Sequence, residues 1–242
     1  MKRALVLSGG GMFGAWQAGV WRGLAPRLES KMESGLELVV GASVGSLNGY
    51  AIAGGVTPDE LCAFWMRREL GRFRGLEGTI RLLMERYPAR MEYAVTLTDL
   101  ARMKPKIVRN RDVTWKHLAA SCAIPGLLPQ QRIGGRWYSD GGLMNPLPVW
   151  AAAELGATEI VAIHALPQIP SSVLKPFVKG FRHVFGHHPP LPAGVQVVTI
   201  EPQGVLGSVR EALVWKQENI ERWIALGEET AKNISIPNCF WR

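Results

Sequence analysis

The sequence predicts an α/β fold in which a mostly parallel sheet is covered by helices on both faces. Short apolar runs alternate along the chain with longer segments of helical pattern, which is typical of parallel strands buried on both sides. Hydrophobic residues make up 47% of the 242 residues, enough to bury a sizeable core. No repeat, low-complexity tract or convincing linker interrupts the alternation, so we expect a single domain over residues 1–242.

The individual elements follow from this alternation. The short apolar runs predict strands over residues 4–7, 36–40, 93–97, 106–108, 136–139, 159–165 and 195–200. Helical patterns occupy residues 13–28, 43–53, 58–87, 113–121, 149–155, 173–185 and 209–233.

Three consecutive glycines, Gly9, Gly10 and Gly11, follow the first predicted strand. With Gly14 they match the G-x-G-x-x-G pattern of dinucleotide-binding loops. That fold needs an acidic residue at the end of the second strand to bind the ribose, and here the second strand leads to a serine instead. A non-enzymatic, Rossmann-like nucleotide-binding module therefore stays as an alternative with one of its features missing.

The serine lies in Gly41-Ala42-Ser43-Val44-Gly45, a G-x-S-x-G sequence between an apolar strand and a helix. This is the pattern of a nucleophile elbow, in which the residues two before and two after the serine must be small. A serine that attacks an ester carbonyl creates an oxyanion, which needs backbone N–H donors. The competing interpretation is a glycine-bracketed turn with a helix-capping serine.

The glycine loop and the residue after the serine can supply those donors. A loop without side chains before a helix is a backbone anion site, so we expect the N–H groups of Gly9, Gly10 and Gly11 to hold the oxyanion. The N–H of Val44 is a possible further donor, by the usual geometry of the elbow.

A base for Ser43 is expected at Asp140, where a predicted strand ends in the turn Asp140-Gly141-Gly142. Aspartate is a weak base at its ordinary pKa near ~3.9, so the oxyanion site must lower much of the barrier. The competing role for Asp140 is to hydrogen-bond its own turn. A Ser-His-Asp hydrolase is the alternative mechanism, with His164 at a strand end or His187 in a proline-rich segment as the base.

Four segments together resemble a known family. "LSGGGMFGAWQAGV", "GASVGSLNG", "ASCAIPGLLP" and "SDGGLMNPLP" are similar, in this order, to the four sequence blocks of the patatin-like phospholipases, over residues 5 to about 150. The resemblance implies a three-layer α/β/α fold and a Ser-Asp dyad of Ser43 and Asp140. It also implies an oxyanion loop at the three glycines and lipid acyl hydrolase activity of phospholipase A, lysophospholipase or carboxylesterase type, without metal or cofactor.

One position departs from the family pattern. A basic residue is common just before the last glycine of the first block, where this chain has Phe13. The missing charge argues against a preference for phospholipid head groups and keeps a neutral acyl ester as an alternative substrate. Asn145 matches the family and is expected to be a structural hydrogen-bonding residue.

Charge and cysteine content bear on partners and compartment. The formal net charge is +8, which favours an anionic partner such as a lipid surface, while no nucleic-acid recognition module is evident. Three widely spaced cysteines suggest a reducing compartment and no zinc site. The apolar run near the N-terminus is too short for a signal peptide, so we expect a cytoplasmic protein, with peripheral membrane contact as a further option.

Two segments combine basic and apolar residues as membrane-surface helices do. They are the arginine-rich stretch at residues 67–86 and the helical pattern at residues 173–185. The competing interpretation is that their apolar faces pack on the sheet and their cations are solvated.

Overall fold

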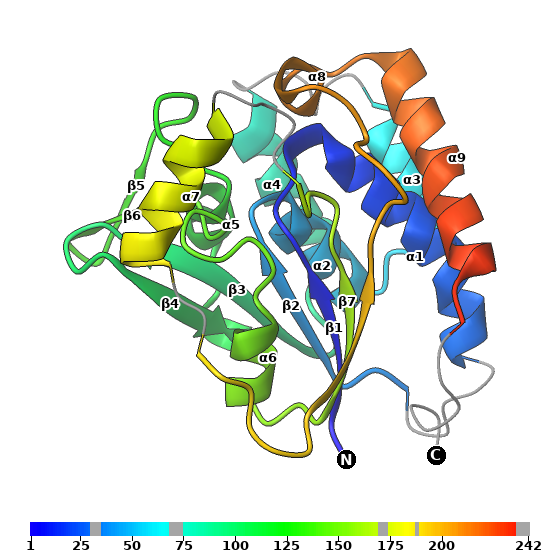
Figure 1. Cartoon of the computed structure of the whole chain (residues 1–242), viewed down its shortest axis with the longest axis horizontal. Helices are drawn as coiled ribbons and strands as arrows, with labels where there is room; N and C mark the ends of the chain where they lie inside the picture. Colours follow the sequence, from blue (N-terminus) through cyan, green and yellow to red (C-terminus); the bar gives the residue numbers. More distant parts are fainter. Residues whose placement is uncertain (30–34, 68–74, 169–173, 187–188, 236–242) are drawn as a thin grey trace.

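A computed structural model describes residues 1–29, 35–67, 75–168, 174–186 and 189–235. Its centre is one sheet of strand order β5-β6-β3-β2-β1-β7-β8, and β4 also pairs with β3 (Figure 1). The strands are β1 (Arg3–Leu7), β2 (Leu38–Ala42), β3 (Glu92–Asp99), β4 (Lys104–Arg109), β5 (Gln131–Ile133), β6 (Arg136–Ser139), β7 (Glu159–Ile163) and β8 (Gln196–Ile200). The helices are η1 (Gly11–Phe13), α1 (Gly14–Glu29), α2 (Val44–Ala53), α3 (Pro58–Trp65), α4 (Leu76–Arg86), η4 (Asn110–Asp112), α5 (Trp115–Ser121), α6 (Val149–Glu154), α7 (Leu174–Phe185), α8 (Val209–Leu213) and α9 (Gln217–Asn233).

The sheet is parallel over five strands and antiparallel at one end. Strands β3, β2, β1, β7 and β8 run parallel to one another. Strands β4 and β6 are antiparallel to β3, and β5 is antiparallel to β6. The predicted mostly parallel sheet is therefore confirmed for its central strands.

Two apolar cores on opposite faces of this sheet make three layers. On β1, Leu5 and Leu7 belong to one core, and Ala4 and Val6 belong to the other, as expected from the alternation of side chains along a strand. The first core contains residues of α1, α2, α3 and α9, and the second contains those of α6. The predicted three-layer α/β/α arrangement is confirmed.

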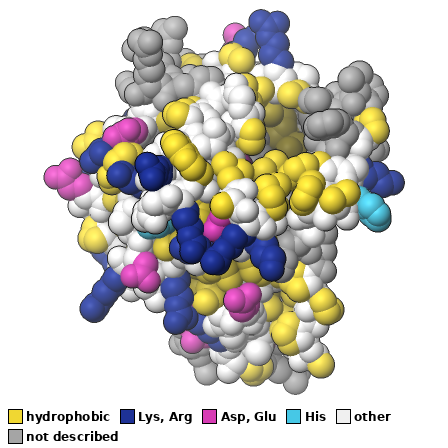
Figure 2. Space-filling model, turned by 90° about the vertical axis from the view of Figure 1, so that its left-hand side faces the viewer, with side chains coloured by type: hydrophobic (Ala, Val, Ile, Leu, Met, Phe, Trp, Pro, Cys, Tyr) yellow, Lys and Arg dark blue, Asp and Glu magenta, His cyan; other side chains and the backbone are white. Residues whose placement is uncertain are grey.

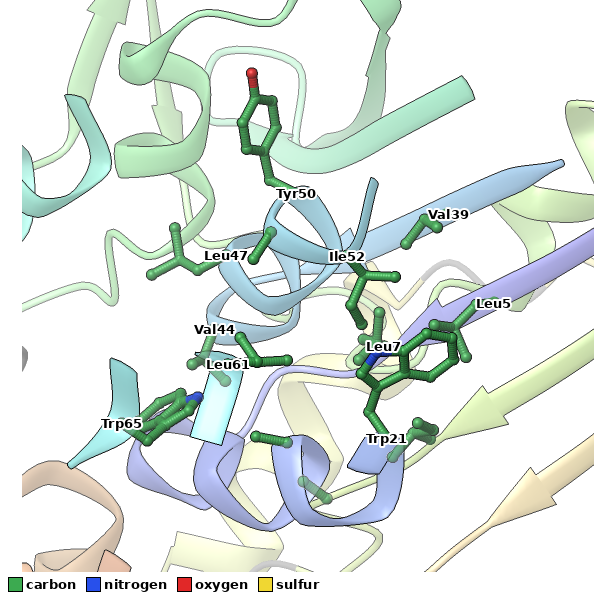
Figure 3. Packing of buried hydrophobic residues seen from close by; sticks show 14 of the residues in the cluster. Leu5, Leu7, Trp21, Val39, Val44, Leu47, Tyr50, Ile52, Leu61 and Trp65 are labelled. Carbon is green, nitrogen blue, oxygen red and sulfur yellow. The ribbon is translucent and has the colours of Figure 1, made fainter. Parts of the chain in front are cut away.

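Helix α2 lies in the middle of the larger core. Figure 3 shows Val44, Leu47 and Ile52 of α2 among side chains from the sheet and from the neighbouring helices α1 and α3. All ten residues of α2 are buried, which explains its small and apolar composition. The helix that begins one residue after Ser43 is therefore held on all sides.

The structure corrects the predicted second strand and the predicted closing helix. The second strand begins at Leu38 and continues to Ala42, because Gly41 and Ala42 still pair with β3. The predicted closing helix over residues 209–233 is two helices, α8 and α9, because the chain is extended at Val214 and Lys216. Between those two residues the Trp215 indole Nε1 donates to the Trp65 carbonyl at 3.0 Å. Strand β5 was not predicted from the sequence.

The helical pattern predicted over residues 58–87 separates into α3 and α4. Arg68, Arg72, Arg74, Val173, His187, His188 and Cys239 lie outside the described residues. None of the helices within the described ranges has the length and apolarity required to cross a bilayer.

Candidate active site

Ser43 occupies a strained turn between β2 and α2. Its φ of 53° and ψ of −131° are uncommon for a residue with a side chain, and strain of this kind concentrates at functional sites. A methyl group on Gly41 would stand 2.3 Å from the Gly45 carbonyl oxygen, and one on Gly45 would stand 2.4 Å from that of Leu7. The requirement for glycine two residues before and after the serine is therefore physical, as the elbow pattern predicts.

The glycine loop lies directly beside this turn. A methyl group on Gly9 would stand 3.2 Å from Cβ of Ser43. The N–H of Gly9 donates to the Pro146 carbonyl at 2.9 Å. This amide therefore already has a backbone acceptor and does not point toward an oxyanion. Gly10 and Gly11 follow Gly9 in the turn that leads into η1 and α1.

Gly11 and Gly14 are required by close neighbours. Gly11 has a φ of +58°, and a methyl group there would stand 2.1 Å from the Ala212 carbonyl oxygen. A methyl group on Gly14 would stand 2.4 Å from Cζ2 of Trp65. The glycine loop is therefore packed against α8 at Gly11 and against α3 and α2 at Gly14.

Asp140 follows β6 in a hydrogen-bonded turn. Its N–H donates to the Ala123 carbonyl at 3.1 Å, and its carbonyl accepts from the Thr98 hydroxyl at 2.8 Å. Oδ1 accepts from the N–H of Gly142 at 2.7 Å, so the carboxylate has the turn-forming role as well as its candidate catalytic one. A methyl group on Gly141 would stand 2.0 Å from the Thr96 carbonyl oxygen.

The register of the sheet brings Ser43 and Asp140 toward each other. Residues 94–96 of β3 pair with both β2 and β4, and residues 98–99 pair with both β4 and β6. A strand has only two edges, and β4 occupies one edge of β3 along both of these stretches. Strands β2 and β6 therefore both lie on the other edge. Ala42 is opposite Thr96 and Ser139 is opposite Thr98, so the next residue of each strand, Ser43 and Asp140, approaches the level of Leu97 from opposite directions.

Ser121, which sequence reasoning did not single out, connects the two turns. Its hydroxyl accepts from the Ser43 N–H at 2.8 Å and donates to the Thr96 carbonyl at 2.9 Å. Its own carbonyl accepts from the N–H of Gly141 at 3.1 Å. Ser121 ends α5 and is fully buried. A serine within "ASCAIPGLLP", the third family-like block, was the available signal.

Buried polar side chains make hydrogen bonds to the backbone on both sides of the glycine loop, at Ser8 and at Gly14. Asn48 donates to the Gly14 carbonyl at 2.9 Å and to Gln17 Oε1 at 3.0 Å, and its own Oδ1 accepts from the Trp65 indole at 2.9 Å. Gln17 donates in turn to the Ser8 carbonyl at 2.8 Å. Polar residues within otherwise apolar helices were the sequence signal for this network, because a buried amide must find partners.

Phe13 is buried in the larger core. Its ring contacts that of Trp223 on α9 edge to face, with centroids 5.0 Å apart at 89°, a favoured aromatic geometry. The position where the family commonly has a cation is thus an apolar contact between the glycine loop and α9. Asn145 accepts from the Leu147 N–H at 3.0 Å, which confirms its structural role.

The histidines differ in their environments. His117 Nδ1 accepts from the Thr114 N–H at 3.0 Å at the start of α5, and burial, followed by the charge of Lys106, lowers the pKa of His117. His164 follows β7 and has Nδ1 3.0 Å from Oε1 of Glu201. Strand β1 separates β7 from β2, so at ~4.8 Å per strand the backbones at His164 and Ser43 are roughly 10 Å apart.

Cys122 is buried beside the candidate dyad. Burial, followed by the negative charge of Asp140 and partly offset by a hydrogen bond with Ser46, raises the pKa of its thiol. Cys122 is therefore a neutral side chain in the wall of the site.

Comparisons with known proteins concern the family and the fold of this chain. The family model described as "Patatin-like phospholipase" matches residues 5–111 and 102–153. The crystal structure of VipD from Legionella pneumophila superposes with a TM-score of 0.56 at 12% identity, covering 96% of this chain and 66% of that one. The type III effector protein ExoU gives a TM-score of 0.48 at 14% identity, covering 95% and 51%. This chain therefore spans about two thirds and half of those two chains, and the likeness to VipD concerns the fold.

Proposed function

This chain belongs to the patatin-like phospholipase family, and we propose that it hydrolyses acyl esters of lipids with Ser43 as nucleophile and Asp140 as base. The observation that carries the proposal is the convergence of β2 and β6 on one edge of β3, which directs these two residues toward the same level. Both residues are at least nine-tenths buried, in keeping with chemistry sheltered from bulk water.

In the proposed reaction the Ser43 hydroxyl attacks the ester carbonyl while Asp140 accepts its proton. The carbonyl oxygen becomes an oxyanion, held by the N–H groups of Gly10, Gly11 and Val44. Gly9 serves instead as the close-contact residue beside Ser43, because its N–H donates to Pro146. Donors that are already in place contribute around 10²–10³ in rate each.

Collapse of the oxyanion breaks the ester bond, and Asp140 returns its proton to the leaving alcohol. The acyl group stays on Ser43 until a water molecule, deprotonated by Asp140, attacks the acyl carbonyl. The acyl–Oγ bond then breaks, Asp140 returns the proton taken from water to Ser43 Oγ, and the fatty acid is released. We include lysophospholipids and neutral esters among the substrates because Phe13 replaces the usual cation.

We propose that residues 1–242 act as one domain. The segment after the family match contributes directly to the site, since α8 contacts Gly11 and α9 contacts Phe13. Peripheral contact with an anionic membrane belongs to the same proposal, because a lipid hydrolase must reach its substrate at a surface.

A fluorophosphonate probe tests the proposed roles. We expect labelling of the folded wild type, none in Ser43→Ala, and a loss of at least a hundredfold in esterase activity in Asp140→Asn. Absence of wild-type labelling would favour the nucleotide-binding module, and near wild-type activity of Asp140→Asn would overturn the dyad.

His164 is the second candidate base, because its contact with Glu201 resembles the histidine–carboxylate pair of a triad. His164→Ala is the matched variant. The dyad requires that it keep most of its activity, whereas the triad requires that it lose as much as Ser43→Ala.

A further inference from the structure

Exposed apolar and basic side chains gather at the antiparallel end of the sheet. Trp137 on β6 is 52% exposed and Leu127, in the segment before β5, is 45% exposed. The hairpin surface is defined here by these two residues and four exposed cations of β4, β5 and β6: Leu127, Trp137, Lys104, Lys106, Arg132 and Arg136. Among the described residues, Trp137 is the only tryptophan that is more exposed than buried.

The strand register distributes these side chains over both faces of this end of the sheet. Arg132 is the cross-strand partner of Trp137, and Arg136 that of Ile133. The neighbouring strand β4 brings Lys104 to the position opposite Asp99, which also pairs with Tyr138 of β6. Lys106 reaches the Tyr138 hydroxyl at 3.2 Å, so the cations of β4 lie with Arg136 on the face of Tyr138. Trp137 and Arg132 point to the other face of the same end of the sheet.

The surface carries a net positive charge. Asp99 is the acid within it, 3.6 Å from Arg136, and its side chain is only 5% exposed. Glu154 is at the margin, across a cavity of about 560 Å³ that it lines with Lys104. Figure 2 faces the side of the molecule that carries β4, β5, β6 and α7, and it shows Lys and Arg side chains gathered in the middle with hydrophobic side chains directly above them.

Exposed apolar residues also line that cavity. Val184 and Phe185 at the end of α7 line it together with Lys104 and are 70% and 40% exposed. A basic surface flanked by exposed apolar residues is the pattern of proteins that bind an anionic bilayer. Each cation near such a surface contributes about fivefold in membrane affinity.

The helix α4 is a weaker candidate for the same contact. Its Arg81 pairs with Glu77 at 2.9 Å and stacks on Trp115 at 3.8 Å. Its Ile80 and Leu83 are buried in the larger core. These residues of α4 therefore fit a helix that packs on the protein better than a helix that contacts a membrane.

We propose that the hairpin surface docks the protein on an anionic phospholipid bilayer. Trp137 lies three residues before Asp140, about 10 Å along an extended strand. Tryptophan prefers the level of the headgroups, where the ester groups of lipids also lie. This proposal rests on the proposed function, because docking here delivers a membrane ester to Ser43 and Asp140.

Vesicle sedimentation tests the docking surface without turnover. Wild type, the double variant Arg132→Glu with Arg136→Glu, and Trp137→Ala are mixed with phosphatidylcholine vesicles that contain or lack phosphatidylglycerol. Leu82→Ala with Arg86→Glu is the matched control, because it removes an exposed leucine and an exposed arginine from α4. Hydrolysis of a soluble short-chain ester checks that each variant is folded.

We expect wild type and the α4 control to bind the phosphatidylglycerol vesicles at least tenfold more tightly than the neutral ones, and more weakly as salt is added. Both hairpin variants should lose at least tenfold in this binding and keep wild-type activity on the soluble ester. Equal wild-type binding to both vesicles, or hairpin variants that bind like wild type, would overturn the docking proposal while labelling of Ser43 upholds the hydrolase. Preference for the anionic vesicles without labelling of Ser43 would overturn the hydrolase instead.

Discussion

The Ser121 hydroxyl accepts a hydrogen bond of 2.8 Å from the backbone N–H of Ser43, across 78 positions of sequence. The same residue holds the Asp140 turn through its carbonyl and Gly141. One buried residue at the end of α5, through its hydroxyl and its backbone carbonyl, thus fixes the nucleophile turn relative to the candidate base. Preorganisation of this kind governs rate more than binding.

Ser121→Ala is expected to lower kcat at least tenfold with little change in KM. The N–H of Ser43 and the Thr96 carbonyl would lose a buried partner, which costs about 1–3 kcal/mol of stability. Thr158→Val is the control, because it removes the hydroxyl that accepts from the Lys2 backbone N–H, just before β1 and β7. It should lower stability without changing kcat. Equal kcat values for both variants, measured with a soluble ester and compared at matched folded fractions, would show that Ser121 has no positioning role.

Gly11→Ala is expected to destabilise the protein by more than backbone strain alone. A positive φ costs an alanine about 1–2 kcal/mol, and here the new methyl group would also collide with the Ala212 carbonyl. Gly156 has a φ of +88° and no atom within 4 Å of the same position. The loss of unfolding free energy in Gly156→Ala, measured with urea, therefore reports the backbone strain alone. Any larger loss in Gly11→Ala reports the contact with α8. Identical losses of unfolding free energy in the two variants would mean that α8 moves away from the new methyl group without cost.

Phe13→Ala is expected to cost about 3–5 kcal/mol of unfolding free energy, as deletion of a buried ring does. Phe13→Arg should be at least as destabilising, because it buries a charge against Trp223. Thermal melts of both variants, with the conservative Phe13→Leu as reference, check this order. A Phe13→Arg protein as stable as Phe13→Leu would mean that α9 can leave the glycine loop.

Ionisation of the buried Cys62 thiol is expected to lower the stability of the protein at high pH. Burial raises the pKa of its thiol to about 11, partly offset by the charge of Arg22, whereas an unfolded cysteine titrates near ~8.5. A group with a raised folded pKa contributes stability that is complete below the unfolded pKa and lost as pH rises through the folded one. The loss should therefore develop between about pH 8.5 and 11.

Urea unfolding of wild type and Cys62→Ala between neutral pH and pH 11 isolates this contribution. The difference between their unfolding free energies should shrink as pH rises, since alanine has no proton to lose. A difference that stays constant with pH would contradict the raised pKa.

Local features of the site were predictable from the sequence because contiguous residues impose them. The glycines around Ser43 are required by contacts within one strand-to-helix turn, and Asp140-Gly141-Gly142 forms its own hydrogen-bonded turn. The central strands were likewise predictable, since their apolar runs are buried on both sides. The short strand β5, with three residues of mixed polarity, had no such signal.

Contacts between distant segments were decided by the tertiary structure. The position of β6 on the β2 edge of β3, the bridge made by Ser121 and the contact of Phe13 with Trp223 each join residues far apart in sequence. No local pattern encodes such a contact, because it depends on which segments the fold places side by side. By itself the sequence determined which residues could carry the chemistry; their approach to one another, and the apolar contact that takes the place of a cation beside the glycine loop, followed only from how the layers pack.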